Sequence, residues 1–274
     1  MNKTAQSKKA ALSARMESLQ SVVVAYSGGV DSSVVAAVAH ELLGDRALVV
    51  TAASPSLARG ELAAARSQAA KWGWNHLVVR THELDRSEYV VNGADRCYWC
   101  KIELFEVLDP IARDRGATIV VGTNRDDLRD YRPGHRAATE RSVSAPLLEA
   151  GLGKDEVRAI AEAIGLSTAD KPAAPCLASR IAYGVEVTPS RLRRIDRAEE
   201  IVSGLGFTDV RVRDHGDLAR IEVSPSEIER AAAIRDRLAG ELSALGWRYV
   251  TVDLAGYRTG SLNAQLNDPV IKRS

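Results

Sequence analysis

Three groups of residues in this sequence have types and spacing that suit chemistry. The first is the run S-G-G-V-D-S at 27–32, in which two glycines stand among hydroxyl and carboxylate side chains. The second is the pair Cys97 and Cys100, spaced as C-Y-W-C, with Cys176 much later in the chain. The third is a pair of adjacent carboxylates at 126–127. These groups suggest anion binding, thiol or metal chemistry, and cation binding, respectively.

The run at 27–32 predicts a phosphate-binding loop. It follows an apolar run at 21–26 and precedes a segment of helical character. Glycines let the backbone approach a ligand, and the amide groups at a helix start point toward an anion. The run lacks the lysine of G-x-x-x-x-G-K-[ST] and does not match G-x-G-x-x-G. It resembles instead the S-G-G-x-D-S loop of the PP-loop enzymes, which split ATP between the α and β phosphates and hold the leaving pyrophosphate.

All six residues of this run are assigned to ATP binding: Ser27, Gly28, Gly29, Val30, Asp31 and Ser32. The two serine hydroxyls and the loop amides are expected to hold phosphate oxygens. The aspartate orients the loop, helps to position Mg²⁺, or is an ordinary acidic residue in the first turn of a helix. A purely structural turn between a strand and a helix is the alternative for the whole run.

A polar segment, G-T-N-R-D-D, begins at Gly122 directly after the apolar run at 118–121. Polar groups placed there are expected at the carboxyl end of a strand, where ligands bind in open α/β sheets. We therefore assign Gly122 to the ATP site and expect Asp126 and Asp127 to bind Mg²⁺ through their carboxylate oxygens. Two solvated loop charges are the alternative.

Strands and helices alternate through the part of the chain that carries these groups. The pattern indicates strands at 21–26, 47–52, 75–80 and 118–122, and helices at 31–43, 57–72, 98–115 and 154–164. This alternation predicts an α/β fold with a doubly wound parallel sheet. A different pattern follows residue 184, with helices at 189–205 and 226–245 and strands at 208–213, 218–223 and 248–254.

We therefore expect two domains. Residues 1–184 would form a PP-loop ATP pyrophosphatase domain, and residues 185–274 a smaller α+β domain for substrate binding or oligomerisation. With 274 residues, 45% of them hydrophobic, the chain is long and apolar enough to bury a sizeable core.

The composition disfavours several classes of partner. Thirty-seven Lys and Arg residues balance 36 Asp and Glu residues, so no net field attracts nucleic acid or an anionic membrane. No apolar run approaches the roughly 18 residues of a membrane span, and the first 20 residues lack the pattern of a secretory signal. We expect a soluble, cytoplasmic protein with a small-molecule substrate and with neither nucleic acid nor membrane as a partner.

Three cysteines are too few, and odd in number, for a disulfide scaffold. A C-x-x-C pair with a distant third cysteine can bind zinc, form a redox disulfide, or consist of buried thiols. Thiolates are also the usual ligands of iron–sulfur clusters. The residues alone leave these alternatives open.

The sequence also resembles the LarE family, the PP-loop sulfur transferases that help to make the nickel-pincer nucleotide cofactor of lactate racemase. The resemblance runs nearly end to end. It is carried by S-G-G-V-D-S at 27–32, G-T-N-R-D-D-L-R-D-Y-R-P-G at 122–134, K-P-A-A-P-C-L-A-S-R at 171–180, R-V-R at 211–213, A-R-I-E-V at 219–223 and G-Y-R-T-G-S-L-N at 256–263. It implies that one carboxylate of a pyridinium dicarboxylate mononucleotide is adenylated by ATP, with Mg²⁺, and then converted to a thiocarboxylate.

The same resemblance implies a source of sulfur. In some members a single cysteine at the position of Cys176 gives up its sulfur and is left as dehydroalanine. Here Cys97 and Cys100 accompany it, as in members whose three cysteines hold a [4Fe-4S] cluster. Three ligands leave one iron open to an extra sulfide, which a sulfide donor would renew. The cluster, the sacrificial cysteine, and the other thiol roles remain alternatives.

Arginines in the shared motifs complete the expected site. Arg211, Arg213 and Arg258 are expected to bind the substrate phosphate through forked hydrogen bonds, or else to be solvent-facing strand residues. Arg180, four residues after Cys176, either faces the acyl-adenylate or caps a loop. A homo-oligomer is also expected.

Three other functions share part of this pattern. An ammonia-dependent ligase such as NAD synthetase uses the same loop but has no need of three cysteines. A tRNA-thiolating enzyme combines the loop with cysteines, but the balanced charge argues against RNA binding. A nucleotide-sensing module without catalysis is the third alternative, and turnover of ATP to pyrophosphate would distinguish it.

Overall fold

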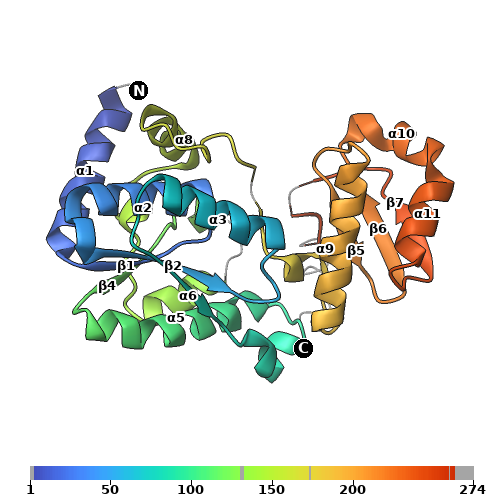
Figure 1. The fold of residues 1–274 in the computed structure, drawn as a ribbon, viewed down its shortest axis with the longest axis horizontal. Coiled ribbons are helices and arrows are strands. Elements are labelled where there is room, and N and C mark those ends of the chain that lie inside the picture. Colours follow the sequence, from blue (N-terminus) through green and yellow to red (C-terminus); the bar gives the residue numbers. More distant parts are fainter. Residues whose placement is uncertain (1–2, 130–132, 173, 259, 263–274) are drawn as a thin grey trace. The chain divides into compact units, whose positions relative to one another are not determined.

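The computed structural model describes residues 3–129, 133–172, 174–258 and 260–262. Its contacts divide the chain into two compact units. The first comprises Met1–Ser54, Arg59–His82 and Cys97–Ala174, and the second comprises Pro55–Ala58, Glu83–Arg96 and Pro175–Ser274 (Figure 1). The second unit thus includes two short segments from the first hundred residues of the sequence. A division into two domains at residue 184 stays a prediction.

The first unit is built on a four-stranded sheet in the order β3-β2-β1-β4. Its strands are β1 (Val22–Ala25), β2 (Ala47–Ala53), β3 (His76–Arg80) and β4 (Thr118–Val121). All neighbouring strands are parallel, which confirms the predicted fold class. The strand order reverses between β1 and β4, because β2 and β3 extend the sheet on the other side of β1. Open α/β sheets bind ligands at such a switch point.

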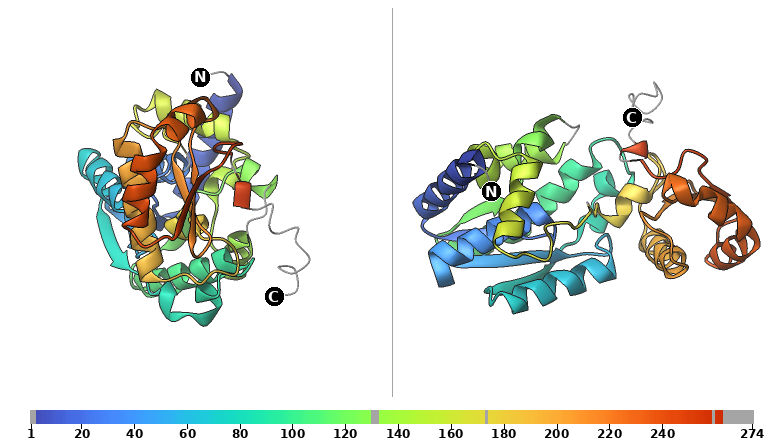
Figure 2. Two further views of the ribbon diagram at one scale, coloured as in Figure 1. Left: turned by 90° about the vertical axis from the view of Figure 1, so that its right-hand side faces the viewer. Right: turned by 90° about the horizontal axis from the view of Figure 1, so that it is seen from above.

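Helices cover both faces of this sheet (Figures 1 and 2). The core on one face takes buried side chains from α1 (Lys3–Leu19), α2 (Val30–Leu43), α3 (Arg59–Lys71), α7 (Pro146–Glu149) and α8 (Lys154–Ala163). The core on the other face takes them from α5 (Arg96–Asp114) and α6 (Gly134–Glu140). The first unit is therefore a three-layer sandwich with the sheet in the middle.

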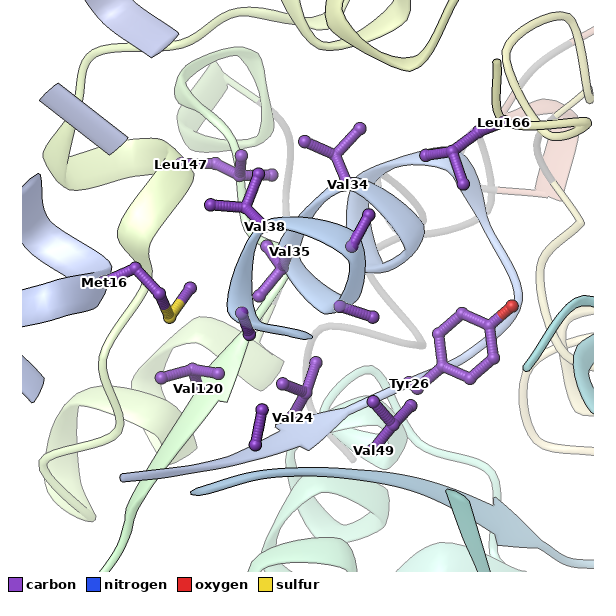
Figure 3. Close-up of a cluster of buried hydrophobic side chains, with 14 of the residues drawn as sticks. Met16, Val24, Tyr26, Val34, Val35, Val38, Val49, Val120, Leu147 and Leu166 are labelled. Carbon is purple, nitrogen blue, oxygen red and sulfur yellow. The ribbon is translucent and has the colours of Figure 1, made fainter. Parts of the chain in front are cut away.

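The alternation of side chains along β1 separates the two cores. Val22 and Val24 belong to the core under α2, whereas Val23 belongs to the core under α5. All three are fully buried. Figure 3 shows the apolar side of α2 lying over β1 and its neighbours. This packing fixes the direction in which the chain leaves β1 and enters α2.

The second unit contains a three-stranded sheet in the order β5-β6-β7. Its elements are α4 (Ser87–Val90), α9 (Pro189–Gly204), β5 (Arg211–Asp214), β6 (Leu218–Glu222), α10 (Ile228–Ala233), α11 (Arg235–Ser243) and β7 (Tyr249–Val252). Strands β5 and β6 are antiparallel, whereas β6 and β7 are parallel. Thr188 caps α9 by accepting a hydrogen bond from the Arg191 amide.

A buried asparagine joins the early segment of the second unit to its later part. The Asn92 side-chain amide donates hydrogen bonds to the carbonyl groups of Ile181, Ala182 and Val185. Its Oδ1 accepts a hydrogen bond from Arg96, which also donates to the Ala178 carbonyl. These bonds satisfy polar groups away from water and hold 83–96 against the chain that follows Pro175.

Two sequence predictions about elements of the second unit were wrong in detail. The helix expected at 226–245 is broken at Ile234, whose ψ of 26° ends α10 before α11 begins. The strand expected from Thr208 starts only at Arg211, because Asp209 has a φ of 50° and extended backbone cannot continue through it. Helix α1 has no counterpart among the predicted elements. None of the described helices has the length and apolar character needed to cross a membrane.

Candidate functional site

The loop at 27–32 connects the end of β1 to the start of α2, as predicted. Gly28 has a φ of +77°, and a Cβ there would lie 3.3 Å from the Cβ of Ala65. A side chain at this position would therefore be strained and crowded. Within the loop, the Ser32 hydroxyl donates to the Gly29 carbonyl and accepts from the Ser27 amide. The loop is thus shaped by its own hydroxyl groups.

The amino end of α2 presents backbone amides without a side-chain cap. Gly29 is the residue before the helix, with extended backbone, and no side chain makes a cap hydrogen bond there. Val30, Asp31 and Ser32 form the first turn. Their amides precede the first intrahelical bond, which the Ser33 amide makes to the Gly29 carbonyl. Such an end favours an anion through both its N–H groups and the helix dipole.

Gly122 at the end of β4 lies against this same helix start. A Cβ on Gly122 would lie 2.7 Å from the amide nitrogen of Ser32 and 2.9 Å from the carbonyl carbon of Asp31. Both loops at the switch point are therefore in direct contact. The close approach gives Gly122 a packing role, while its assignment to ATP binding stays a prediction.

Asp31 is held by two residues distant in the sequence. Its Oδ2 accepts a hydrogen bond from Lys154 Nζ at 2.5 Å, and its Oδ1 accepts one from Asn124 Nδ2 at 3.1 Å. Lys171 approaches the loop elsewhere, donating from Nζ to the Gly28 carbonyl at 3.1 Å and to Glu61 at 2.6 Å. Neither lysine was singled out by the sequence motifs, although Lys171 opens the shared run at 171–180.

Asp126 and Asp127, the two predicted Mg²⁺ ligands, accept hydrogen bonds from backbone amides. Asp126 Oδ2 accepts a hydrogen bond from the Lys154 amide at the start of α8, and Asp127 Oδ2 accepts one from the Asn124 amide. Asn124 Oδ1 in turn accepts a hydrogen bond from the Asp126 amide. Within the described part of each unit, no group of three or more His, Cys, Asp or Glu side chains is close enough to hold a metal ion. Residues 130–132 of the same motif lie outside the described residues.

Cys97 and Cys100 lie near the start of α5, three residues apart and therefore on one side of the helix. Cys97 is exposed and Cys100 is partly buried, and both are thiols. Gly134 packs nearby, since a Cβ there would lie 3.4 Å from the Cys97 carbonyl oxygen and 2.9 Å from Cγ of Lys101. The end of the motif at 122–134 is thus placed beside the C-Y-W-C pair.

Cys176 belongs to the second unit and precedes the short 3₁₀ turn η4 (Leu177–Arg180). Its side chain is partly buried and is a thiol. The Leu177 amide donates to the Ser56 carbonyl, and the Ser179 amide donates to the Cys176 carbonyl. The backbone around this cysteine is therefore anchored on both sides of the turn.

Arg180 is the principal side chain that holds this turn. It is buried, with 4% of its surface exposed, and it donates from Nε and Nη2 to the carboxylate of Glu199 at 3.0 and 3.1 Å. Its Nη1 donates to the carbonyl groups of Pro175 and Cys176 and to the Ser179 hydroxyl. These contacts hold the loop, and a role of Arg180 toward the acyl-adenylate stays a prediction.

The three arginines expected to bind phosphate differ in their surroundings. Arg213 is buried and paired with the fully buried Glu222 at 2.7 Å, and it also donates to the Ser179 carbonyl and the Ser261 hydroxyl. Arg211 lies over the Tyr257 ring, with 5.1 Å between the guanidinium carbon and the ring centroid. Arg258 is exposed.

Burial, followed by the nearby positive charge of Arg180, lowers the pKa of Arg211 from its usual value. Desolvation disfavours the charged form, and a bound anion restores that balance. Arg213 and Arg211 follow each other on the same face of β5, two residues apart. Thr259 and the residues from Asn263 onward, parts of the last shared motif, lie outside the described residues.

Comparison with known proteins shows which family the sequence resembles. The family model described as asparagine synthase matches residues 5–96, which include the loop at 27–32 and strands β1 to β3. This match covers only about a third of the chain. It therefore concerns the part of the sheet that carries the phosphate loop, and it includes neither the second sheet nor any of the three cysteines.

Longer similarities extend over both units. The chain is 47% identical over 253 residues to the uncharacterized protein slr1717 of Synechocystis sp., covering 90% of this chain and 94% of the relative. It is 37% identical over 265 residues to the pyridinium-3,5-bisthiocarboxylic acid mononucleotide synthase of Lactiplantibacillus plantarum, covering 96% of each. It is 28% identical over 239 residues to the uncharacterized protein MJ0830 of Methanocaldococcus jannaschii, covering 87% of this chain and 91% of the relative. The 37% identity to the Lactiplantibacillus plantarum synthase extends over nearly the full length of both chains. Together with the phosphate loop at the switch point of a parallel sheet, it shows that the chain belongs to the LarE family of PP-loop enzymes.

Proposed function

We propose that this protein is an ATP-dependent sulfur transferase that converts a carboxylate of pyridinium-3,5-biscarboxylic acid mononucleotide to a thiocarboxylate. The observation that carries the proposal is 37% identity over 96% of the chain to a synthase of the corresponding bisthiocarboxylic acid. The uncapped start of α2 beside β4 supports ATP as the activating substrate, because it suits a polyphosphate.

The proposed reaction has two steps. In the first, a carboxylate oxygen of the mononucleotide attacks the α-phosphorus of ATP, the bond to the β-phosphate oxygen breaks, and pyrophosphate leaves. Ser27, Ser32 and the amides of Val30 to Ser32 would hold the phosphate oxygens, with Mg²⁺ near Asp31 and the carboxylates at 126–127. In the second, a sulfur nucleophile attacks the acyl carbon and AMP leaves. Arg211, Arg213 and Arg258 would bind the phosphate of the mononucleotide.

We propose that Cys97, Cys100 and Cys176 together hold a [4Fe-4S] cluster as the sulfur-carrying group. Thiolates are the chemically appropriate ligands, and the first two lie one helical turn apart at the start of α5. When bound, the cluster would supply an iron site at which an external sulfide can be carried. The residues of the chain would ligate it, while Arg180 and Glu199 would hold the Cys176 turn in place.

The sulfur source can be decided by the fate of Cys176. Protein reconstituted anaerobically with iron and sulfide is expected to turn over repeatedly and to keep Cys176 intact by mass spectrometry. Conversion of Cys176 to dehydroalanine after one turnover, with no iron required, would instead establish a sacrificial cysteine. The Cys97→Ser and Cys100→Ser variants separate the two routes, because only the cluster route needs them.

The overall activity is tested with Mg-ATP and the dicarboxylate mononucleotide. Pyrophosphate release should depend on the mononucleotide, and the product mass should show one carboxylate oxygen replaced by sulfur. Asp31→Ala and Ser32→Ala should abolish AMP transfer while leaving the fold intact. Asp45→Ala, at an exposed turn, is the control and should keep AMP transfer. Pyrophosphate release with an ammonia-accepting carboxylate or with tRNA, and none with the mononucleotide, would reject the proposal. Light scattering would measure the proposed homo-oligomeric state.

A further inference from the structure

The loop at 27–32 has no positively charged residue of its own, although its proposed ligand is a polyphosphate. The only ionisable group in the loop is the carboxylate of Asp31, which repels phosphate. Loop amides and the helix dipole provide partial charges, but a nucleotide triphosphate carries several full negative charges. A cation from another part of the fold is therefore the expected complement.

Lys154 brings such a cation to the loop. It is the first residue of α8, and its Nζ lies 2.5 Å from Asp31 Oδ2 in the first turn of α2. The position of the lysine backbone is fixed, because its amide donates to Asp126 Oδ2 at 2.7 Å. The Gly153 amide before it donates to Glu156, so this helix start is capped in place.

The Lys154 side chain can still turn toward a ligand. It retains 35% of its exposure, and the Asp31 side chain retains 21%. Solvent screens a partly exposed ion pair, so this pair contributes less to stability than a buried one does. An ammonium has three donors, and among the described residues the Lys154 ammonium has one acceptor, Asp31 Oδ2. The Lys154–Asp31 pair is therefore better suited to exchanging partners when a ligand binds than to stabilising the fold.

Lys171 differs from Lys154 in its exposure and in the number of acceptors that it contacts. It is less exposed, at 20%, and it divides its donors between the Gly28 carbonyl and Glu61. A lysine bound to a loop carbonyl stabilises the backbone conformation of that loop, here the left-handed Gly28. Lys171 is thus suited to shaping the loop, and Lys154 to contacting what the loop binds.

We propose that Lys154 is a substrate-binding residue whose ammonium group contacts a phosphate oxygen of ATP at the start of α2. The inference rests on the proposed use of ATP by this loop and deepens it. Asp31 holds the Lys154 ammonium next to the phosphate position. When the Asp31 carboxylate ligates Mg²⁺, the ammonium would pair with the phosphate in place of that carboxylate. Lysine then performs from α8 the function that the P-loop lysine performs from within its own loop.

Calorimetric titration of the full-length protein with Mg-ATP and, separately, with adenosine tests this role. Lys154→Met should raise the Kd for Mg-ATP by roughly tenfold or more, because a charge-assisted hydrogen bond is lost. The Kd for adenosine, which has no phosphate, should stay unchanged. Lys154→Arg should keep most of the affinity for Mg-ATP. Lys71→Met, an exposed lysine at the end of α3, is the matched control and should bind both ligands like the wild type.

The outcomes separate this inference from the proposed function. Wild-type protein that does not bind Mg-ATP would overturn both. Wild-type binding with an equal Kd in Lys154→Met would overturn the role of Lys154 and leave the proposed function standing. An equal loss of affinity for adenosine and Mg-ATP would show a structural role and would also overturn it. Should Lys154→Met fail to fold, Lys154→Gln gives the same comparison with a polar side chain.

Discussion

Gly122 lies so close to Ser32 that a Cβ on the glycine would come within 2.7 Å of the serine amide nitrogen. The two residues belong to different loops, one after β4 and one at the start of α2. Because backbone atoms meet here, neither side can yield by rotating a side chain. The contact fixes the spacing between the two loops of the proposed ATP site.

Gly122→Ala should therefore destabilise the protein by about 1–3 kcal/mol through overpacking. Its denaturation midpoint in urea should fall, and Mg-ATP affinity should fall with it. Gly60→Ala in helix α3 is the control, since nothing lies within 4 Å of a Cβ there and the change should be neutral or slightly stabilising. Equal midpoints for the wild type and Gly122→Ala would show that the loops can separate at no cost.

The ion pair between Arg180 and Glu199 should control the environment of Cys176. Arg180→Ala leaves the Glu199 carboxylate, 16% exposed, without its partner, and should cost about 3–5 kcal/mol of stability. Arg180→Lys should recover part of that loss but not the contacts to the carbonyl groups of Pro175 and Cys176.

Alkylation of Cys176 provides a measurement that stability alone does not determine. In a background with Cys97 and Cys100 replaced by serine, iodoacetamide should modify Cys176 at a different rate in Arg180→Lys than in the parent, under conditions where both are folded. Identical rate constants would mean that Arg180 stabilises the unit without positioning the cysteine.

Two of the expected phosphate-binding arginines, Arg213 and Arg258, should differ in how much their replacement changes stability. Arg213→Ala leaves the fully buried Glu222 with fewer partners and should destabilise the protein by about 3 kcal/mol. Arg258→Ala, at an exposed position, should change stability by no more than about 0.5 kcal/mol. Loss of mononucleotide affinity in Arg258→Ala, measured by calorimetry, would then report binding alone. Unchanged affinity in this variant would remove Arg258 from the phosphate site.

Stability should fall in mildly acidic solution because of His76. Burial, followed by the charge of Arg66, lowers the pKa of His76, so the folded state holds its proton less tightly than the unfolded state. The contribution to stability is present above about pH 6.5 and is lost as pH falls through the folded-state pKa. Urea unfolding at several pH values should show a weaker pH dependence for His76→Gln than for the wild type.

His215 should add to the same trend, because burial and then Arg220 lower its pKa as well. The double variant with His76→Gln and His215→Gln should therefore show a flatter profile than either single variant. Parallel profiles for the wild type and His76→Gln would show that His76 does not contribute.

Local patterns were enough to predict the strands, the phosphate loop and the parallel sheet of the first unit. The β-branched run before Ser27 and the glycines after it specify a strand, a turn and a helix within one short segment. The neighbouring position of the loop after β4 follows from the rule that ligands bind where strand order reverses. The fold class therefore required no information about distant contacts.

Contacts between distant residues could not be predicted in this way. Lys154 and Asp31 are 123 positions apart, and no motif links a residue at the start of α8 to the phosphate loop. The break at Ile234 has neither glycine nor proline to indicate it, so local propensity favours one continuous helix. The buried pairing of Arg180 with Glu199 likewise depends on how α9 packs against the Cys176 turn.

The second unit is assembled from three stretches of chain, and this has a consequence for how the protein is made. Asn92 supplies hydrogen bonds to carbonyl groups at 181–185 across about 90 residues of intervening chain. During synthesis the segment at 83–96 is made first, so these hydrogen bonds can form only after residues 181–185 have been synthesised. A recombinant fragment that begins at residue 185 would lack Asn92 and Arg96, and it should fold poorly unless a peptide spanning 83–96 is added back.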